Sequence, residues 1–196
     1  MLLSQDAQDL LFREAHTTYG FTGEPVTDDE IRAVHDLVKY GPTAMNGQPL
    51  RVLLVRSDEA RERLTAHMAP GNKPKIGKAP LVAILAADLD FHHELPRLFP
   101  ANPNARDGFE RDEAGRVASA KFNAGLQTAY FIVGLRAAGL AAGPMGGFDA
   151  DGLSKEFFPQ GDHHAVAVVN IGRHAESDSH YPRQHRLSYD EVVTVV

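Results

Sequence analysis

LVAILAA, at residues 81–87, is an unbroken run of apolar side chains. Two further apolar runs lie in RVLLVR at 51–56 and AVAVVNI at 165–171. A strand with one face in water alternates apolar and polar residues, whereas a strand covered on both faces is apolar throughout. Because helix-like segments separate the three runs, the sequence predicts one sheet with helices on both faces, in an α/β or α+β fold.

The segments between these runs carry helix signals. An amphipathic helix is predicted from Leu2 to about Ala15, with its apolar anchors at 10–12. Thr27 and Glu30 have the spacing of a capping box, and the helix that they begin is expected to end near Gly41. The remaining helices are predicted at 58–67, 112–140, 150–158 and after Ser188, and the main loops at 41–49, 69–80, 90–108 and 141–148.

The helix predicted at 112–140 is apolar almost all round after Phe122. A helix of this kind is buried on every side. Either the interior of a core or the interface of a dimer would bury it.

The composition indicates one folded domain, residues 1–196, because 43% of the residues are hydrophobic and 23% are charged. A net charge of −6 argues against a nucleic-acid partner, since binding phosphates requires a basic face. The chain has no cysteine, which excludes disulfides, thiolate metal sites and cysteine nucleophiles. With no signal-peptide pattern and no apolar run of the ~18 residues that a membrane helix needs, we expect a cytoplasmic protein without a membrane partner.

The histidine pairs His92–His93 and His163–His164 give little support for a metal site, because neighbours on an extended chain point in opposite directions. The sequence contains no HExxH motif and no GxSxG motif. We therefore predict no metal ligand and no catalytic nucleophile.

Four segments carry side chains suited to a ligand: GPTAMNGQP at 41–49, GNKPK at 71–75, AAGPMGGFD at 141–149 and HYPRQHR at 180–186. Amides can bind the edge of a heteroaromatic ring, lysine and arginine can bind anions, and glycine lets the backbone approach a ligand. Each segment also has an ordinary structural interpretation, as a turn with Asn46-Gly47 at positive φ, a solvated basic loop, a helix end or a polar surface loop. The glycine-rich segment is not a Rossmann fingerprint, because it follows a helix and lacks the GxGxxG spacing.

The order of these segments along the chain resembles that of the nitroreductase family. The shared pattern is PTxxNxQP after the second helix, GNxxK before a strand, AAGL at the end of the long helix, GPMxGFD, and an arginine-containing tail after NIG. It runs from about Phe12 to Tyr189. GPMGGFD, NIG, RLSYDE at 186–191 and ELPRLFP at 94–100 are most similar to the branch named for malonic semialdehyde reductase, or 3-hydroxypropionate dehydrogenase.

The resemblance implies an α+β, nitroreductase-like fold, with a central, mainly antiparallel sheet flanked by helices and the long buried helix at a homodimer interface. It implies two FMN molecules at that interface, each touched by both chains. NAD(P)H would be the co-substrate in a ping-pong reaction, and the small acceptor would be malonic semialdehyde, a nitro compound or a quinone. Because flavin carries the hydride chemistry, no amino-acid nucleophile is required.

The resemblance also assigns cofactor-binding positions. The loop around Thr43 and Asn46 would reach the flavin from one subunit, Asn72 and Lys75 would face the pyrimidine edge, and Arg186 with Arg183 would bind the phosphate. The full set that it implies is His16, Thr17, Pro42, Thr43, Asn46, Asn72, Lys75, Pro144, Met145, Gly146, Gly147, Arg183 and Arg186.

One position departs from the family pattern. His16 stands where the similar branch has arginine, while Thr17 keeps the hydroxyl group. A neutral imidazole has one donor and no fixed charge, whereas a guanidinium has five donors and a permanent charge. FMN is therefore expected to bind more weakly or to depend more on Arg183 and Arg186, unless Arg13, one turn back, substitutes.

Two other classes of function stay open. The chain could bind flavin for storage or sensing without turnover, or it could be an interaction protein without a cofactor. Residues 90–108 fit no fixed motif, and we expect them to form a lid or a pocket wall that selects the acceptor.

Overall fold

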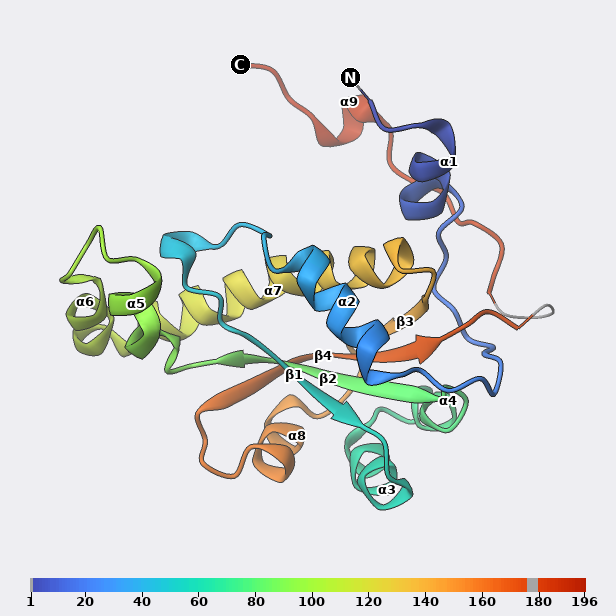
Figure 1. Ribbon diagram of the computed structural model, residues 1–196, viewed down its shortest axis with the longest axis horizontal. Coiled ribbons are helices and arrows are strands. Elements are labelled where there is room, and N and C mark those ends of the chain that lie inside the picture. The colour runs from blue at the N-terminus through green and yellow to red at the C-terminus, as the bar shows by residue number, and fades with distance from the viewer. Residues whose placement is uncertain (1, 176–179) are drawn as a thin grey trace.

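The sheet at the centre of the computed structural model has four strands (Figure 1). These are β1 (Leu50–Val55), β2 (Leu81–Asp88), β3 (Ala141–Met145) and β4 (His163–Gly172), in the order β1-β2-β4-β3. Each neighbouring pair is antiparallel, which decides for an α+β fold over an α/β fold. The structure describes residues 2–175 and 180–196. Three of the strands are the predicted apolar runs.

The prediction of a loop at 141–148 is wrong for its first part, which is β3. Gly143 and Pro144 lie inside this strand, and both residue types are depleted in strands. They are tolerated because β3 is at the edge of the sheet. Gly143 also leaves room for the backbone of Thr18, whose N–H donates to the carbonyl oxygen of Ala142 at 3.0 Å. This contact fixes the N-terminal segment along β3.

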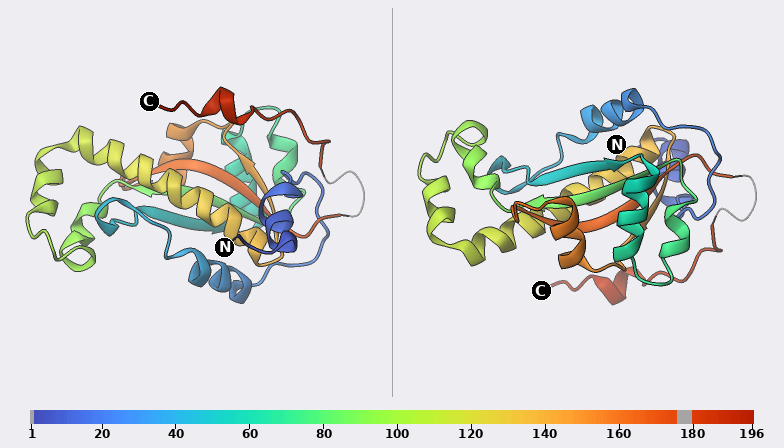
Figure 2. Two further views of the ribbon diagram at one scale, coloured as in Figure 1. Left: turned by 90° about the horizontal axis from the view of Figure 1, so that it is seen from above. Right: turned by 90° about the horizontal axis from the view of Figure 1, so that it is seen from below.

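Helices cover both faces of the sheet (Figures 1 and 2). On one face lie α2 (Asp28–Val38) and α7 (Glu113–Ala137), and on the other lie α3 (Asp58–His67), α4 (Lys73–Ile76) and α8 (Ala150–Phe157). Along β2, Leu81 and Leu85 enter the core under α2 and α7, while Val82 and Ile84 enter the opposite core. Burial of each such side chain contributes about 1.5–3 kcal/mol, which explains why LVAILAA has no polar residue.

The long helix is not buried on every side within one chain. One face of α7 packs in the core through residues such as Phe131 and Leu135. The other face exposes Phe122, Leu126 and Tyr130, which recur every four residues, and Phe122 is 67% exposed. The apolar character of α7 therefore serves two surfaces, one inside the chain and one facing outward.

The predicted N-terminal helix is shorter than expected and divides into α1 (Gln5–Gln8) and the π-helix η1 (Asp9–Arg13). Its predicted apolar anchors Leu10 and Phe12 are exposed rather than packed. In Figure 1 this segment lies away from the sheet, on the same side as α9 (Tyr189–Val192), but Figure 2 shows α1 and α9 apart from each other.

The capping box at Thr27 is confirmed, and so is the helix after Ser188, which begins with a capping box that was not predicted. The segment 90–108 is more regular than predicted, since it contains the 3₁₀ helix η3 (Phe91–Glu94), α5 (Leu95–Leu98) and the start of α6 (Ala105–Arg111). Pro96 does not prevent this, because the first turn of a helix tolerates proline. None of the described helices is both long and apolar enough to cross a membrane.

The close approach of α2 and α7 generates a stability prediction. A Cβ atom at Gly134 would collide with Val38 on α2, so Gly134→Ala is expected to destabilise the chain by about 1–3 kcal/mol. Gly125 on the same helix is the matched control, because a Cβ there meets nothing within 4 Å. Gly125→Ala should stabilise the fold by up to about 1 kcal/mol, since alanine is the better helix former. Urea unfolding measures both, and equal effects of the two substitutions would contradict the prediction.

Candidate functional site

Basic side chains from three parts of the chain converge on one hollow beside the tail. We call it the basic hollow. It is lined by the N-terminal segment at His16 and Thr17, by Arg136 near the end of α7, and by the tail at Arg183 and Arg186, and its volume is about 230 Å³. The structure thus brings together His16, Thr17, Arg183 and Arg186. Arg13, the possible substitute for an arginine at position 16, does not line the hollow and instead pairs with Asp9 at 3.2 Å.

The arginines of the basic hollow bind backbone carbonyl groups. Arg183 donates to the carbonyl oxygen of Ala15 at 3.1 Å and lies 3.2 Å from Nε2 of His16. Arg136 donates to the carbonyl oxygen of Leu11 at 3.3 Å, and Arg186 donates to two carbonyl groups of the tail. Among residues 2–175 and 180–196, none of these three arginines forms an ion pair with a carboxylate.

Burial and mutual repulsion oppose the positive charge in the basic hollow. Partial burial lowers the pKa of Arg136, and nearby Arg183 lowers it further. The pKa of His16 is also lowered, first by burial and then by His180 and Arg183. Cations that are partly desolvated and lack a counterion favour a bound anion, and guanidinium groups match the geometry of phosphate.

Arg136 was not found by sequence reasoning. A basic residue in the last turn of a helix is common, because it interacts favourably with the helix dipole. Only the packing of the N-terminal segment against α7 shows that Arg136 faces the same hollow as Arg183.

A second cluster, the lysine–amide cluster, contains Asn72, Lys75 and Gly147. Nζ of Lys75 donates to Oδ1 of Asn72 at 2.9 Å, and Nδ2 of Asn72 donates to the carbonyl oxygen of Gly147 at 3.0 Å. The Lys75 ammonium also lies 5.0 Å from the ring centroid of Tyr19, which lines the basic hollow. The two sites are therefore neighbours, with Tyr19 between them.

The glycine-rich segment borders this cluster. A Cβ atom on Gly147 would lie 2.7 Å from Nδ2 of Asn72, whereas Gly146 faces open space. The side chain of Met145, another of the implied cofactor-binding residues, is buried in the core beneath α3 and α8. Only the backbone of Met145 can face a ligand, and Pro144, which precedes it in β3, is half-buried.

The third set of predicted residues lies in the loop at 41–49, where the backbone has strained φ angles. Met45, Asn46 and Gln48 have φ values of 53°, 52° and 43°. The positive φ expected at Asn46-Gly47 is confirmed at Asn46 and wrong at Gly47, whose φ is −70°. Such conformations cost of order 1–3 kcal/mol each and are retained where surrounding contacts impose them, which is common at functional sites.

Side chains of neighbouring helices impose this conformation. The N–H of Ala44 donates to Oδ1 of the buried Asn123 on α7 at 2.7 Å, and the N–H of Leu50 donates to Oε1 of Gln127 at 2.9 Å. Nδ2 of Asn46 donates to the carbonyl oxygen of Leu98 in α5 at 3.0 Å. Within the loop, Oγ1 of Thr43, the residue after Pro42, accepts from the N–H of Gln48 at 3.2 Å. The signal for Asn123 and Gln127 in the sequence was that both are polar residues in an otherwise apolar helix.

One chain does not bring this loop to the other two clusters. The loop between α2 and β1 lies beside α5 and α6, whereas α1 and the tail lie at the other end of the sheet (Figure 1). Asn123 holds the loop and Arg136 lines the basic hollow, and they are separated by 13 residues of α7. At 1.5 Å per residue this is about 20 Å along the helix axis.

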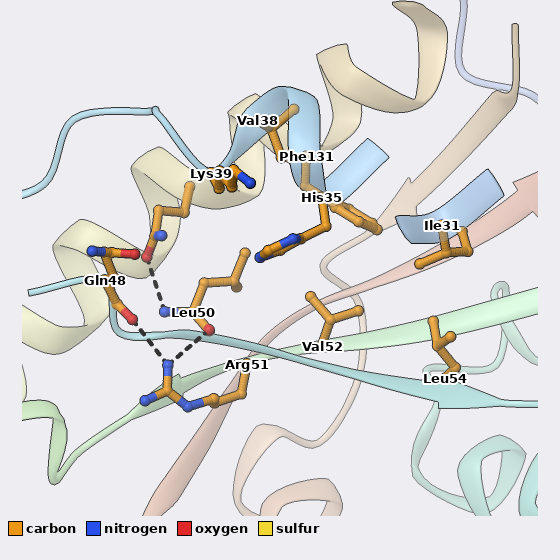
Figure 3. Close-up of a pocket in the computed structure, with 11 residues that line it drawn as sticks. Ile31, His35, Val38, Lys39, Gln48, Leu50, Arg51, Val52, Leu54 and Phe131 are labelled. Atoms are coloured by element: carbon orange, nitrogen blue, oxygen red, sulfur yellow. Dashed lines mark hydrogen bonds between the residues drawn. The ribbon is translucent and has the colours of Figure 1, made fainter. Parts of the chain in front are cut away.

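A further hollow of about 340 Å³ lies between α2, β1 and α7 (Figure 3). Its walls are mainly apolar, with Ile31, Val52 and Phe131 among them. The guanidinium of Arg51 is already bonded to the carbonyl oxygens of Gln48 and Leu50 and to Asp88. This hollow therefore suits apolar atoms and not a phosphate, and none of the predicted cofactor-binding residues lines it.

Comparison with known proteins agrees with this architecture. The model of the Nitroreductase family matches residues 12–173. A Streptomyces coelicolor protein with the provisional name NADH dehydrogenase/NAD(P)H nitroreductase is 60% identical over 196 residues, 100% of this chain and 99% of that protein. A Rhodopseudomonas palustris protein of the same provisional name is 44% identical over 188 residues, 96% of this chain and 95% of that protein.

Solved structures share the fold at lower identity. The crystal structure of a provisionally named nitroreductase from Exiguobacterium sibiricum, in complex with FMN, has a TM-score of 0.85 at 18% identity, covering 100% of this chain and 99% of that one. The nitroreductase YdfN of Bacillus subtilis, also provisionally named, has a TM-score of 0.84 at 20% identity, covering 98% of this chain and 100% of that one. With a family match over most of its length, the chain belongs to the nitroreductase family.

Proposed function

We propose that this protein is an FMN-dependent oxidoreductase that transfers hydride from NAD(P)H to a small acceptor by a ping-pong mechanism. The observation that carries the proposal is the adjacency of the basic hollow and the lysine–amide cluster, joined by Tyr19. An anion site beside a site for the polar edge of a planar ring is the combination that FMN requires. The FMN found in the related Exiguobacterium sibiricum structure supports the choice of cofactor.

The chain's residues fit each part of this cofactor. Arg183, Arg186 and Arg136 would hold the phosphate through charge-assisted hydrogen bonds, and Thr17 would add a hydroxyl donor. The backbone at Gly146 and Gly147 would approach the ring, since Gly146 has no Cβ and faces open space. When bound, FMN supplies the hydride chemistry, so the absence of a nucleophile in the sequence is expected.

Lys75 would stabilise the negative charge that develops at the pyrimidine edge on reduction. Its position is fixed by the hydrogen bond to Asn72, which is itself bonded to the carbonyl of Gly147. A preorganised cation at that edge favours the reduced form and raises the reduction potential.

We also propose that the active form is a homodimer with flavins at its interface. The loop at Thr43 and Asn46 lies at the opposite end of the chain from the basic hollow, so a second chain is needed to bring both sets to one cofactor. The outward face of α7, with Phe122, Leu126 and Tyr130 exposed, is the kind of surface that a second chain would cover.

The acceptor is proposed to be a small carbonyl, nitro or quinone compound, with malonic semialdehyde as the first candidate. That choice is supported by the resemblance of GPMGGFD, NIG, RLSYDE and ELPRLFP to the corresponding branch. The segment with α5 and α6 would form the wall that selects the acceptor, because it contacts the loop at 41–49 through Asn46 and Leu98.

With no cysteine and no described membrane-spanning helix, we propose the cytoplasm as the location of the protein.

The purified protein tests the cofactor and the activity together. We expect about one flavin per chain by absorbance and FMN-dependent oxidation of NADH or NADPH that accelerates with an acceptor from the three classes. Lys75→Gln should keep FMN but lower the rate of flavin reduction by about tenfold, because the cation at the pyrimidine edge is lost. A yellow protein without NAD(P)H oxidation would favour a flavin-storage or sensing role, and a colourless protein that does not take up FMN would exclude the proposal.

His16→Arg is expected to tighten FMN binding about tenfold at pH 8, since one charge-assisted hydrogen bond contributes about 1.5 kcal/mol. The pKa of His16 is lowered, so the imidazole is neutral at that pH and gains charge only as the pH falls through this lowered pKa. The advantage of the variant should therefore shrink in acid. Fluorescence titration at pH 8 and pH 5.5 gives the ratio of the dissociation constants for FMN of the parent and the variant. Protonation of the FMN phosphate affects both proteins equally, so it cancels in this ratio. An equal or weaker affinity of the variant at pH 8 would contradict the prediction.

Mixed dimers test the composite site. One chain carries Thr43→Val and Asn46→Ala, and the other carries Lys75→Gln and Arg183→Ala. If each flavin is held by both chains, the mixed dimer has one site with all four changes and one intact site, so it should recover about half of the parent activity. If each site belongs to one chain, both sites of the mixed dimer stay damaged and activity remains at the level of the two variant homodimers.

A further inference from the structure

Three side chains that the proposed reaction does not use meet at the end of the chain opposite the basic hollow. His92 and His93 lie on η3, and Glu110 lies on α6. Nε2 of His92 is 2.8 Å from Oε2 of Glu110, and Nε2 of His93 is 3.6 Å from the same oxygen. One ligand atom from each of the three residues lies within 4.8 Å of the other two. We call this group the His–His–Glu cluster.

The prediction that the side chains of His92 and His93 point apart, which counted against a metal site, is wrong. Adjacent side chains point apart only on an extended chain. In η3 the backbone is helical, and the two imidazole rings lie with centroids 4.2 Å apart and planes inclined at 35°. The turn therefore directs both rings to the same carboxylate.

We propose that His92, His93 and Glu110 form a binding site for a divalent transition-metal ion, best matched by Zn²⁺, with further coordination positions open to water. Two imidazole nitrogens and one carboxylate oxygen are a ligand set that zinc and related ions accept. With bonds of about 2.1 Å in a tetrahedral arrangement, two ligand atoms lie about 3.3–3.5 Å apart. The observed separations of 2.8 Å and 3.6 Å fall on either side of this value, so rotation of exposed side chains is sufficient for coordination.

Burial gives the cluster one fixed ligand and two adjustable ones. The side chain of His92 is 1% exposed, while those of His93 and Glu110 are 57% and 54% exposed. Nδ1 of His92 is buried without a hydrogen-bond partner among the described residues, so Nε2 is the ring nitrogen that meets a polar group. An ion can enter from the side of His93 and Glu110, where water can complete the coordination.

The local charge suits a dication. Two neutral imidazoles and one carboxylate carry a net charge of −1. The guanidinium of Arg116, whose charge also acts on Glu110, lies 3.9 Å from Oδ1 of Asp90.

A metal at this position would join η3 to α6 and so stiffen the segment that we assign to the acceptor wall. The ring of Phe91 on η3 packs against Gly47, where an added Cβ would lie 3.0 Å from it, and Leu98 in α5 accepts the hydrogen bond from Asn46. The ion would thus act on the strained loop through packing and not on the hydride transfer itself. The site does not depend on flavin being bound.

Zinc titration of the full chain, as purified and then freed of metal with a chelator, tests the proposal. Calorimetry should give one Zn²⁺ per chain. His93→Ala and Glu110→Gln should each weaken binding at least tenfold, and both residues are exposed enough for the variants to fold. His164→Ala is the matched control, because it changes one histidine of the other adjacent pair, on β4, and should leave the affinity unchanged.

Two further measurements distinguish a metal site from a simple ion pair. Co²⁺ should give the visible absorption of a four- or five-coordinate ion in the parent and lose it in Glu110→Gln, and Zn²⁺ should raise the melting temperature of the parent but not of that variant. Substoichiometric uptake, or equal affinity in the parent and both cluster variants, would overturn the proposal. Binding that disappears in His180→Ala instead would also overturn it, because the ion would then belong to the histidines at His16 and His180, whose rings lie 4.1 Å apart.

Discussion

Burial of β2 and β4 on both faces is the constraint on which the rest of the molecule depends. A strand with apolar side chains on both sides is stable only between two layers, so α2 and α7 must lie on one face and α3, α4 and α8 on the other. A sheet of this length needs a helix of comparable length above it, and the 25 residues of α7 span about 37 Å. The same helix can then hold functional groups at both ends of the sheet. Asn123 near its middle orients the loop at 41–49, and Arg136 near its end faces the basic hollow.

Both ends of the sheet store unfavourable free energy that the core offsets. The loop at 41–49 contains three positive φ angles outside glycine, and buried Asn123 supplies part of the hydrogen bonding that maintains them. The basic hollow contains arginines without carboxylate partners among the described residues, and Arg136 is partly desolvated there. A sequence selected only for stability would relax both features. Their presence together in a chain of the nitroreductase family supports the proposal that these positions bind the cofactor.

The sequence predicts those features that local signals determine. Three strands follow from continuous apolar runs, and the helix at 28–38 follows from Thr27 and Glu30, whose hydrogen bonds are those of a capping box. Features that depend on distant contacts were missed. β3 forms despite Gly143 and Pro144 because an edge position exists beside β4, and His92 and His93 point the same way because η3 packs on α6. Arg136 and Asn123 have roles that no spacing in the sequence reveals, since their partners are more than 70 residues away.

In the proposed FMN complex, the basic hollow would also link phosphate binding to the position of both chain ends. The N-terminal helices α1 and η1 have no buried residue, and their described contact with the body of the chain includes the bond from Arg136 to the carbonyl oxygen of Leu11. The tail adds a bond from Arg183 to the carbonyl oxygen of Ala15. Without an anion, the charges of Arg136 and Arg183 repel each other, which opposes the contacts that hold these segments together. A phosphate placed among these side chains would turn the electrostatic repulsion into attraction. Because linked equilibria are reciprocal, an anion that binds there would order the two chain ends, and better ordered chain ends would bind the anion more tightly. The exposed apolar residues of the same region, Leu10 and Phe12, would be positioned for a partner chain by the same event.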